Sequence, residues 1–365
     1  SATVTPEARA AFLEALDGNP ANPSSLHGPG VAASRVLEQA REALRAVAGS
    51  RFRRVVLVSG GTEANNLAVL GLGRGGRKRG VVATTIEHAS VLSALDELRE
   101  RGAEVVLVPV GPTGEVEPER LLEAARGAAL VAVHLVHNEL GTIVDVASLS
   151  TELTRISPDT VLHVDAVQAL GRLDLPTALG GAVSVAVSGH KVGAPQGVGA
   201  LLLAEEARPR PLLFGGDQQD GLRPGTENVA GAAALGVAAR QAAAESPALV
   251  ERLGRLDGRL RVGVAAFGER LRPLVPPDRA VPGLVALALR GLPPEVMLHK
   301  LEQRGVVASA GSACHARRAR SPLLDALGAP RDVGLIRVSM GRGTTEDDVD
   351  GFLEAARDAL RGTAP

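Results

Sequence analysis

The stretch SVAVSGHKVGAPQGVGALLL, residues 184–203, contains two apolar runs of strand length joined by a short loop. Five further runs of this kind precede it, at 55–59, 81–85, 104–110, 130–136 and 161–165. Strands that are apolar on both faces and alternate with helical stretches are typical of a parallel sheet covered by helices on both sides. The sequence therefore predicts an α/β fold with a mostly parallel, seven-stranded sheet.

The character of the chain changes after this sheet. Long Ala/Arg/Leu-rich helical stretches begin at about residue 228, and the Pro-rich segment PLVPPDRAVPG, residues 273–283, follows them. Beyond this segment a strand, a helix, a second strand and a final helix predict a smaller α+β unit. We expect a large domain at 14–255 and a small domain at 256–365 that also includes residues 1–13.

Composition excludes several classes of protein. The chain has 365 residues, is 45% hydrophobic and carries a net charge of −1, with no Trp or Tyr, which favours neither nucleic-acid binding nor base stacking. No run of about 18 uncharged apolar residues occurs, and the N-terminal residues do not resemble a signal peptide, so we expect no membrane span and a cytoplasmic protein. The single cysteine, Cys314, excludes an internal disulfide and a thiolate metal cluster; no metal is expected.

Polar residues follow the predicted strands. They occur as SGGTE at 59–63, EHAS at 87–90, HNELG at 137–141, DAVQ at 165–168 and SGHK at 188–191. Ligands of open α/β sheets bind beyond the carboxyl ends of the strands, so these segments predict one site. Only three of the 40 basic residues are lysines, and one of them, Lys191, lies in this set.

The residue types indicate a phosphorylated cofactor. SGGT before a helix offers backbone N–H groups and a hydroxyl to a phosphate, but lacks the Gly-Lys-Ser/Thr ending of a nucleoside-triphosphate loop. A lysine on one loop and an aspartate at the end of a neighbouring strand suit pyridoxal phosphate, which needs an amine for a Schiff base and an anion for its pyridine nitrogen. Arginine cannot replace that lysine, because the guanidinium stays protonated.

The chain resembles the pyridoxal-phosphate-dependent cysteine desulfurases of the class V aminotransferase fold (fold type I), in the IscS/NifS-like branch with a GSAC loop. The matching segments include SGGTEANNLAVLG at 59–71, HVDAVQALG at 163–171, SGHK at 188–191, RPGTEN at 223–228 and SAGSAC at 309–314. Together these segments span nearly the whole chain in the order of the family.

The resemblance implies a role for each matched residue in holding the cofactor. Lys191 forms the Schiff base and moves protons at the substrate carbon, Asp165 pairs with the pyridine nitrogen, Gln168 binds the ring oxygen, and His88 stacks on the ring and assists proton transfer. The phosphate is held by the backbone around Gly61 and by the side chains of Thr62, Ser188 and His190. Thr226 reaches the phosphate site of a neighbouring subunit, which implies a homodimer.

The resemblance also implies the substrate and the reaction. Asn138, beside the cofactor, and Arg337 receive the carboxylate of L-cysteine, for which a bidentate guanidinium is well suited. Cys314 attacks the substrate sulfur, becomes a persulfide and releases L-alanine. The nearby basic residues of HARRAR, 315–320, favour its thiolate. As the chain has no second cysteine, the sulfur passes to another protein, such as an iron–sulfur cluster assembly scaffold.

Alternative interpretations remain open at this level. Selenocysteine lyase, or another class V aminotransferase, fits the same cofactor residues, and a pyridoxal-phosphate-binding regulatory protein is the alternative outside the enzymes. An inert buried cysteine is the common alternative for Cys314. The identity of the sulfur acceptor is not predicted by any segment of the sequence.

Overall fold

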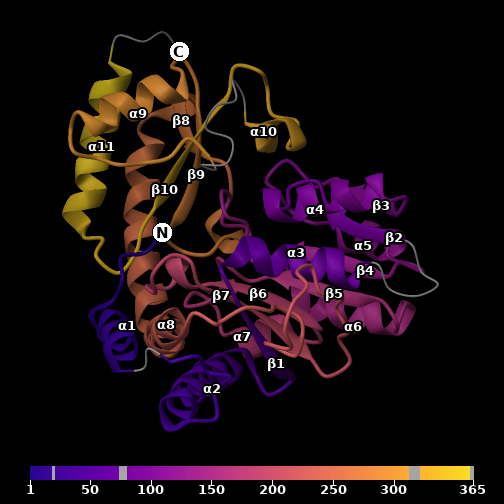
Figure 1. The fold of residues 1–365 in the computed structure, drawn as a ribbon. Coiled ribbons are helices and arrows are strands. Elements are labelled where there is room, and N and C mark those ends of the chain that lie inside the picture. The colour runs from indigo at the N-terminus through magenta and orange to yellow at the C-terminus, as the bar shows by residue number, and fades with distance from the viewer. Residues whose placement is uncertain (19–20, 74–79, 312–320, 362–365) are drawn as a thin grey trace. The chain divides into compact units, whose positions relative to one another are not determined.

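The computed structural model describes residues 1–18, 21–73, 80–311 and 321–361. Packing of the chain separates a larger unit, formed by residues 1–108, 118–135 and 144–246, from a smaller unit, formed by residues 109–117, 136–143 and 247–365. The division falls within the long helix α8, Val229–Ala265, next to its internal proline Pro247 (Figure 1).

The larger unit contains a seven-stranded sheet in the order β1-β7-β6-β5-β4-β2-β3. The strands are β1 Phe52–Val58, β2 Gly80–Thr84, β3 Glu104–Val108, β4 Leu130–His134, β5 Val161–Asp165, β6 Ser184–Ser188 and β7 Gly199–Ala204. Only β7 runs antiparallel to its neighbours, β1 and β6, whereas the other adjacent pairs are parallel. The predicted mostly parallel seven-stranded α/β fold is confirmed.

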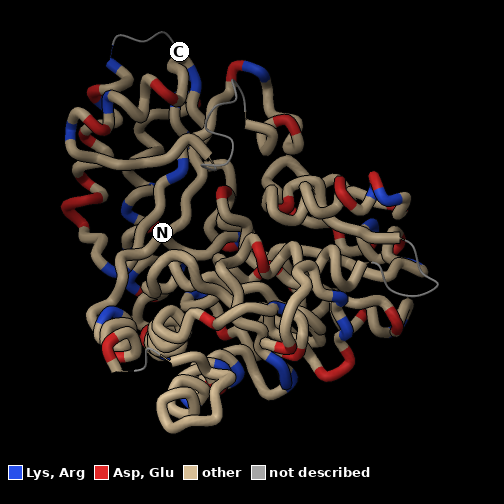
Figure 2. The backbone as a smooth tube through the Cα atoms, in the orientation of Figure 1, with Lys and Arg blue, Asp and Glu red and all other residues tan. Residues whose placement is uncertain are grey.

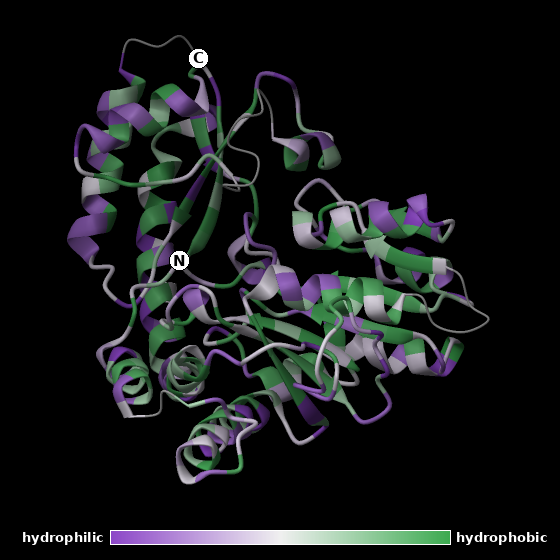
Figure 3. Cartoon of the chain, viewed as in Figure 1, coloured by the Kyte–Doolittle hydropathy of each residue, from purple (hydrophilic) through white to green (hydrophobic). Residues whose placement is uncertain are grey.

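Helices cover both faces of this sheet (Figure 1). The helices of this unit before α8 are α1 Pro6–Gly18, α2 Gly28–Ala48, α3 Gly61–Leu72, α4 Ala89–Glu100, α5 Pro118–Ala124, α6 Val146–Ile156 and α7 Leu175–Leu179. Helices α3 and α4 pack on one face over a core of aliphatic side chains from the central strands. Figure 3 shows the strands as predominantly hydrophobic along their length, which is why they lie between two helical layers.

The smaller unit is built on a three-stranded antiparallel sheet in the order β10-β9-β8. Its elements are β8 Leu271–Pro273, β9 Leu284–Leu289, β10 Gly334–Ser339, α9 Pro294–Glu302, α10 Pro322–Ala326 and α11 Glu346–Leu360, with 3₁₀ turns at Gly268–Arg270 and Pro277–Arg279. A separate apolar core joins β9 and β10 to α9, α11 and the second half of α8. The predicted strand–helix–strand–helix order is present, with β8 as an additional short strand.

The predicted domain bounds, 14–255 and 256–365 with 1–13, stay a prediction. The two packing units differ from these bounds because residues 1–13 belong to the larger unit and the smaller unit resumes at Pro247. Backbone hydrogen bonds hold the N-terminal segment there: Ala2 N–H donates to His190 O at 2.7 Å, and Thr5 N–H donates to Gly193 O at 2.9 Å.

Basic and acidic residues are interspersed along the backbone, as Figure 2 shows. Neighbouring arginines and carboxylates pair along several helices, for example Arg99 with Asp96 and Arg155 with Glu152. Among the described residues, no helix has the length and apolar character needed to cross a membrane. Nor do the described ranges contain a cluster of three or more His, Cys, Asp or Glu side chains fit to ligate a metal.

Candidate active site

The carboxyl ends of β5 and β6 lie side by side in the larger unit, because Asp165 pairs with Ala186 in the parallel ladder. Asp165 is the last residue of β5. Strand β6 ends at Ser188 and leads directly into the 3₁₀ turn Gly189–Lys191, where Lys191 is half-buried. The structure thus places Asp165 and Lys191 at the same edge of the sheet, where α/β folds bind ligands.

Asp165 is buried, with 8% of its surface exposed, and two donors orient its carboxylate. Val167 N–H donates to Oδ1 at 3.0 Å, and the Asn65 amide donates from Nδ2 to Oδ2 at 2.7 Å. Burial raises the pKa of Asp165 above its ordinary value, against the two hydrogen bonds and the charge of His88, which lower it, while Glu87 raises it further. A buried carboxylate of this kind gains stability from a cationic partner.

Asn65 connects Asp165 to two histidines. Because its Nδ2 donates to a carboxylate, its Oδ1 accepts, and the His163 Nε2–H donates to Oδ1 at 3.0 Å. The same Nδ2 donates to Ser90 Oγ at 2.9 Å, which leaves the Ser90 hydroxyl proton for His88 Nδ1 at 2.8 Å. The donors therefore run in one direction through this network, from His163 to Asn65, from Asn65 to Ser90 and from Ser90 to His88.

His88 is held by the start of α4. It is the N-cap residue, and its Nδ1 accepts from the Ser90 N–H at 3.1 Å as well as from the Ser90 hydroxyl. With Nδ1 occupied as an acceptor, the neutral ring carries its proton on Nε2. The sequence prediction named His88 but not Ser90, the residue that sets this tautomer.

The start of α3 offers unpaired backbone donors. Its N-cap, Gly60, has no side chain to cap the first turn, so the first N–H groups of α3 are available to an anion. A Cβ on Gly61 would lie 2.7 Å from Val167 Cγ2 and 3.5 Å from Ser188 Cβ, so the first turn of α3 closely approaches the loop after β5 and the end of β6. Thr62 is exposed on this turn.

His190, predicted to hold the phosphate, and Gln168, predicted to bind the ring oxygen, lie on the loops after β6 and β5. His190 Nδ1 lies 2.8 Å from Ser1 Oγ, and its pKa is lowered by burial, by Lys191 and by the N-terminal amine, which favours a neutral ring. Gln168 is half-buried three residues beyond Asp165. Their predicted roles stay predictions.

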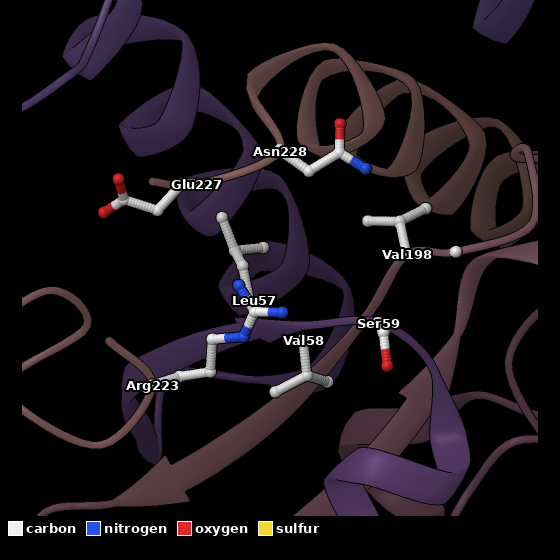
Figure 4. A pocket seen from close by; sticks show the side chains of 8 residues that line it. Leu57, Val58, Ser59, Val198, Arg223, Glu227 and Asn228 are labelled. Atoms are coloured by element: carbon white, nitrogen blue, oxygen red, sulfur yellow. The ribbon is translucent and has the colours of Figure 1, made fainter. Parts of the chain in front are cut away.

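A shallow pocket adjoins the start of α3 in the larger unit. Figure 4 shows its lining, which includes Ser59 from the end of β1 and Arg223, Glu227 and Asn228 from the segment before α8. The Arg223 Nε donates to Glu63 Oε1 at 3.1 Å, and Ser59 N–H donates to Glu63 Oε2 at 2.7 Å. Burial raises the pKa of Glu63, but these contacts outweigh it and the pKa is lowered.

Thr226 lies in the same segment and is exposed, one residue after Gly225, whose φ is +97°. Such a φ favours glycine, so the turn that presents Thr226 depends on Gly225. Among the described residues, no contact of Thr226 indicates its role, which stays a prediction.

The smaller unit brings together the two residues predicted to bind the substrate carboxylate. Arg337, on β10, donates from Nη1 to the backbone oxygen of Asn138 at 3.1 Å and from Nε to Ser339 Oγ at 3.1 Å. Burial lowers the pKa of Arg337, and the nearby Glu139 carboxylate counteracts that effect. Both residues are half-buried, which suits a guanidinium that must meet a small anion.

The segment that leads to Cys314 is attached to β10. Ser309 and Arg337 exchange two backbone hydrogen bonds, of 3.2 and 2.6 Å, and Gly311 follows with φ +80°. Cys314 itself lies outside the described residues, and its role rests on the sequence alone.

Comparisons with known proteins identify the family of this chain. The class-V aminotransferase model matches residues 2–352. An IscS-like cysteine desulfurase of Mycobacterium tuberculosis is 36% identical over 375 residues, which cover 98% of this chain and 95% of that protein. A NifS-like protein of known structure superposes with a TM-score of 0.91 at 28% identity, over 99% of this chain and 97% of the other. The structure of SspA in complex with cysteine gives 0.80 at 26% identity, over 93% and 96%.

The fold and the match over residues 2–352 place the chain in the class-V aminotransferase family. Within that class, the chain belongs to the cysteine desulfurase family of the IscS/NifS type.

Proposed function

We propose that this chain removes sulfur from L-cysteine with the help of pyridoxal phosphate, releasing L-alanine and retaining the sulfur as a persulfide on Cys314. The observation that carries the proposal is the buried Asp165 carboxylate, aligned by Asn65 and Val167 at the sheet edge that also presents Lys191. Membership of the cysteine desulfurase family supports the choice of substrate.

The described residues fit pyridoxal phosphate at both ends. The buried Asp165 carboxylate accepts two hydrogen bonds and retains acceptor capacity for a protonated ring nitrogen. The uncapped first turn of α3, with Thr62 and the neighbouring Ser188, suits a phosphate. In this proposal Lys191, His88 and Gln168 contact the cofactor between these ends.

Each of the proposed site residues has a defined role in the reaction. When bound, pyridoxal phosphate supplies an electron sink for bonds broken at the amino-acid carbons. Lys191 Nζ takes and returns the proton at the α-carbon, and His88 holds a proton on Nε2 for transfer. In this proposal Arg337 and Asn138 bind the substrate carboxylate, as the resemblance implies.

Cys314 receives the sulfur. Its thiolate forms an S–S bond to the substrate sulfur while the C–S bond breaks, and the electron pair left on carbon takes up a proton. One enzyme thiol and one L-cysteine thus give one enzyme persulfide and one L-alanine. From the resemblance alone, the proposal extends to a homodimer completed by Thr226, to transfer of the persulfide sulfur to an acceptor such as an iron–sulfur scaffold, and to a cytoplasmic location.

Conservative lysine variants test the cofactor site. Lys191→Arg keeps the charge but cannot bond covalently to the cofactor, whereas Lys300→Arg is the matched control, since Lys300 donates to Ala359 O in the smaller unit. After borohydride treatment, mass spectrometry is expected to find the cofactor on Lys191 in the wild type and in Lys300→Arg. Equal labelling of Lys191→Arg would contradict the assignment.

Cys314→Ala tests the reaction. We expect this variant to bind the cofactor and L-cysteine, seen as a change in the visible spectrum, but to form no L-alanine and no persulfide. Undiminished formation of alanine would refute the role of Cys314, and conversion of L-cysteine to its keto acid would identify an aminotransferase instead.

A further inference from the structure

A second acid–imidazole pair is buried next to Asp165. Glu87, in the loop after β2, accepts from Thr84 Oγ1 at 2.6 Å and from His134 Nδ1 at 2.9 Å, both through Oε1. The side chains of Glu87 and His134 are 0% and 5% exposed. His134 is the last residue of β4 and pairs directly with Asp165 on β5, so the two side chains stand next to each other on the same face of the sheet.

Glu87 bonds to His134 through Oε1. Glu87 Oε2 is buried and has no hydrogen-bond partner among the residues that the structure describes. Burial lowers the pKa of His134, but the attraction of Glu87, its hydrogen bond and the charge of Asp165 outweigh burial and raise the pKa above its ordinary value. The pair is therefore best described as an imidazolium held by a carboxylate.

The same pair acts on Asp165. An uncompensated charge on Glu87 raises the pKa of Asp165, because two buried carboxylates repel each other. Asp165 must be ionised to hold a protonated ring nitrogen. An imidazolium at His134, adjacent to Asp165 and bonded to Glu87, removes this conflict.

Other groups facing His134 do not supply that positive charge. His163, on β5, has a pKa lowered by burial to about 3 and is neutral. His88 Nδ1 already accepts two hydrogen bonds from Ser90, so this atom offers no donor to Glu87. From α3 and α4, the side chains of Asn65 and Ser90 are uncharged.

We propose that His134 is a positioning residue of the cofactor site: as an imidazolium bonded to Glu87, it offsets the charge of Glu87 and keeps Asp165 ionised for the pyridine nitrogen. This inference rests on the proposed pyridoxal phosphate site. It assigns to a strand histidine, outside the predicted set of site residues, control over the protonation of the cofactor ring.

The titration of Asp165 in the cofactor-free protein tests the charge relation directly. With ¹³C-labelled aspartate, and Asp165→Asn to assign the signal, His134→Gln is expected to raise the pKa of Asp165 by about one unit. Glu87→Gln in the same chain removes the repelling charge, so the double variant is expected to return to the wild-type value. A purely packing role for His134 predicts no such rescue.

The control variant is His299→Gln, the same exchange at an exposed histidine of α9. An unchanged Asp165 titration in His134→Gln, or a double variant that fails to recover, overturns the proposal. If His134→Gln does not fold, the single variant Glu87→Gln provides the test. The His134 ring, followed with ¹³C-labelled histidine, is then expected to have a pKa at least about one unit lower than in the wild type. An unchanged His134 titration in that variant equally overturns the proposal.

Cofactor affinity provides the second measurement. At a pH below the Asp165 transition of the wild type, a rise of about one unit in the pKa of Asp165 lowers its ionised fraction about tenfold. Under these conditions, equilibrium dialysis is expected to show pyridoxal phosphate binding about tenfold weaker in His134→Gln than in the wild type, with recovery in the double variant. Equal affinities of His134→Gln and the wild type refute the proposal. A wild-type protein that binds no pyridoxal phosphate contradicts the proposed function instead, and the Asp165 titration still decides whether His134 controls the carboxylate.

Discussion

Lowering the pH is expected to destabilise the protein through His163. This side chain is 0% exposed, donates from Nε2 to Asn65 Oδ1 at 3.0 Å and lies 2.9 Å from Ser184 Oγ through Nδ1. Burial lowers its pKa from 6.5 to about 3. Between pH 6.5 and about 3, the unfolded chain binds a proton at His163 that the folded protein does not bind. The stability contributed by the neutral ring is therefore complete above pH 6.5 and is lost as the pH falls.

The size of the effect follows from the width of this interval. Each pH unit within it corresponds to about 1.4 kcal/mol, so acidification to about pH 4 is expected to remove roughly 3 kcal/mol of the free energy of unfolding. Urea denaturation of the cofactor-free protein between about pH 7 and pH 4 measures this loss. His163→Gln retains an amide donor for Asn65 and an acceptor for Ser184 but does not titrate.

The comparison of the two proteins is decisive. The difference in unfolding free energy between wild type and His163→Gln is expected to narrow by roughly 3 kcal/mol over this range, whereas His299→Gln, at an exposed site, is expected to follow the wild type. Parallel pH profiles for wild type and His163→Gln would refute the reasoning, because they would mean that His163 does not remain neutral in the folded state.

Three further predictions concern single residues. Asn65→Ala leaves three buried polar partners unsatisfied and is expected to lower the urea-derived free energy of unfolding by about 3 kcal/mol, against about 1 kcal/mol for Asn66→Ala; equal losses would contradict the network. Gly311→Ala places a Cβ 2.6 Å from Glu139 Oε2 at φ +80° and is expected to cost about 1–2 kcal/mol in the same assay, whereas an unchanged value would refute the crowding. Arg337→Lys is expected to raise KM for L-cysteine more than it lowers kcat; a change in kcat alone would argue against carboxylate binding.

Much of the fold was predictable because its signals are local. Seven apolar runs and the stretches between them predicted the strands and the helical layers, since a strand buried on both faces has no polar positions to display. The same local signals located Asp165 and Lys191 at strand ends, where loops carry binding residues. The glycines of residues 59–61 and the helix after them likewise indicated an anion site from spacing alone.

The boundary of the smaller unit was harder to predict. Residues 1–13 were predicted to join the small domain, but backbone bonds to residues 190 and 193 attach the N-terminal segment to the larger unit. Helix α8 continues through Pro247, which the sequence marks as a break, because packing on both sides of the proline outweighs the one lost N–H donor. Such choices depend on contacts between distant segments.

By itself, the sequence determined the order of strands and helices and the residue types at the strand ends. It also singled out Lys191 and Cys314 as the residues suited to this chemistry. Only the tertiary structure decided that Asn65, Glu87, His134 and His163 surround Asp165. Asn65, for example, lies 98 residues from His163 and 100 residues from Asp165 in the sequence. Their charges follow from that arrangement, because burial removes water and makes each neighbouring charge or hydrogen bond decide which groups keep their protons.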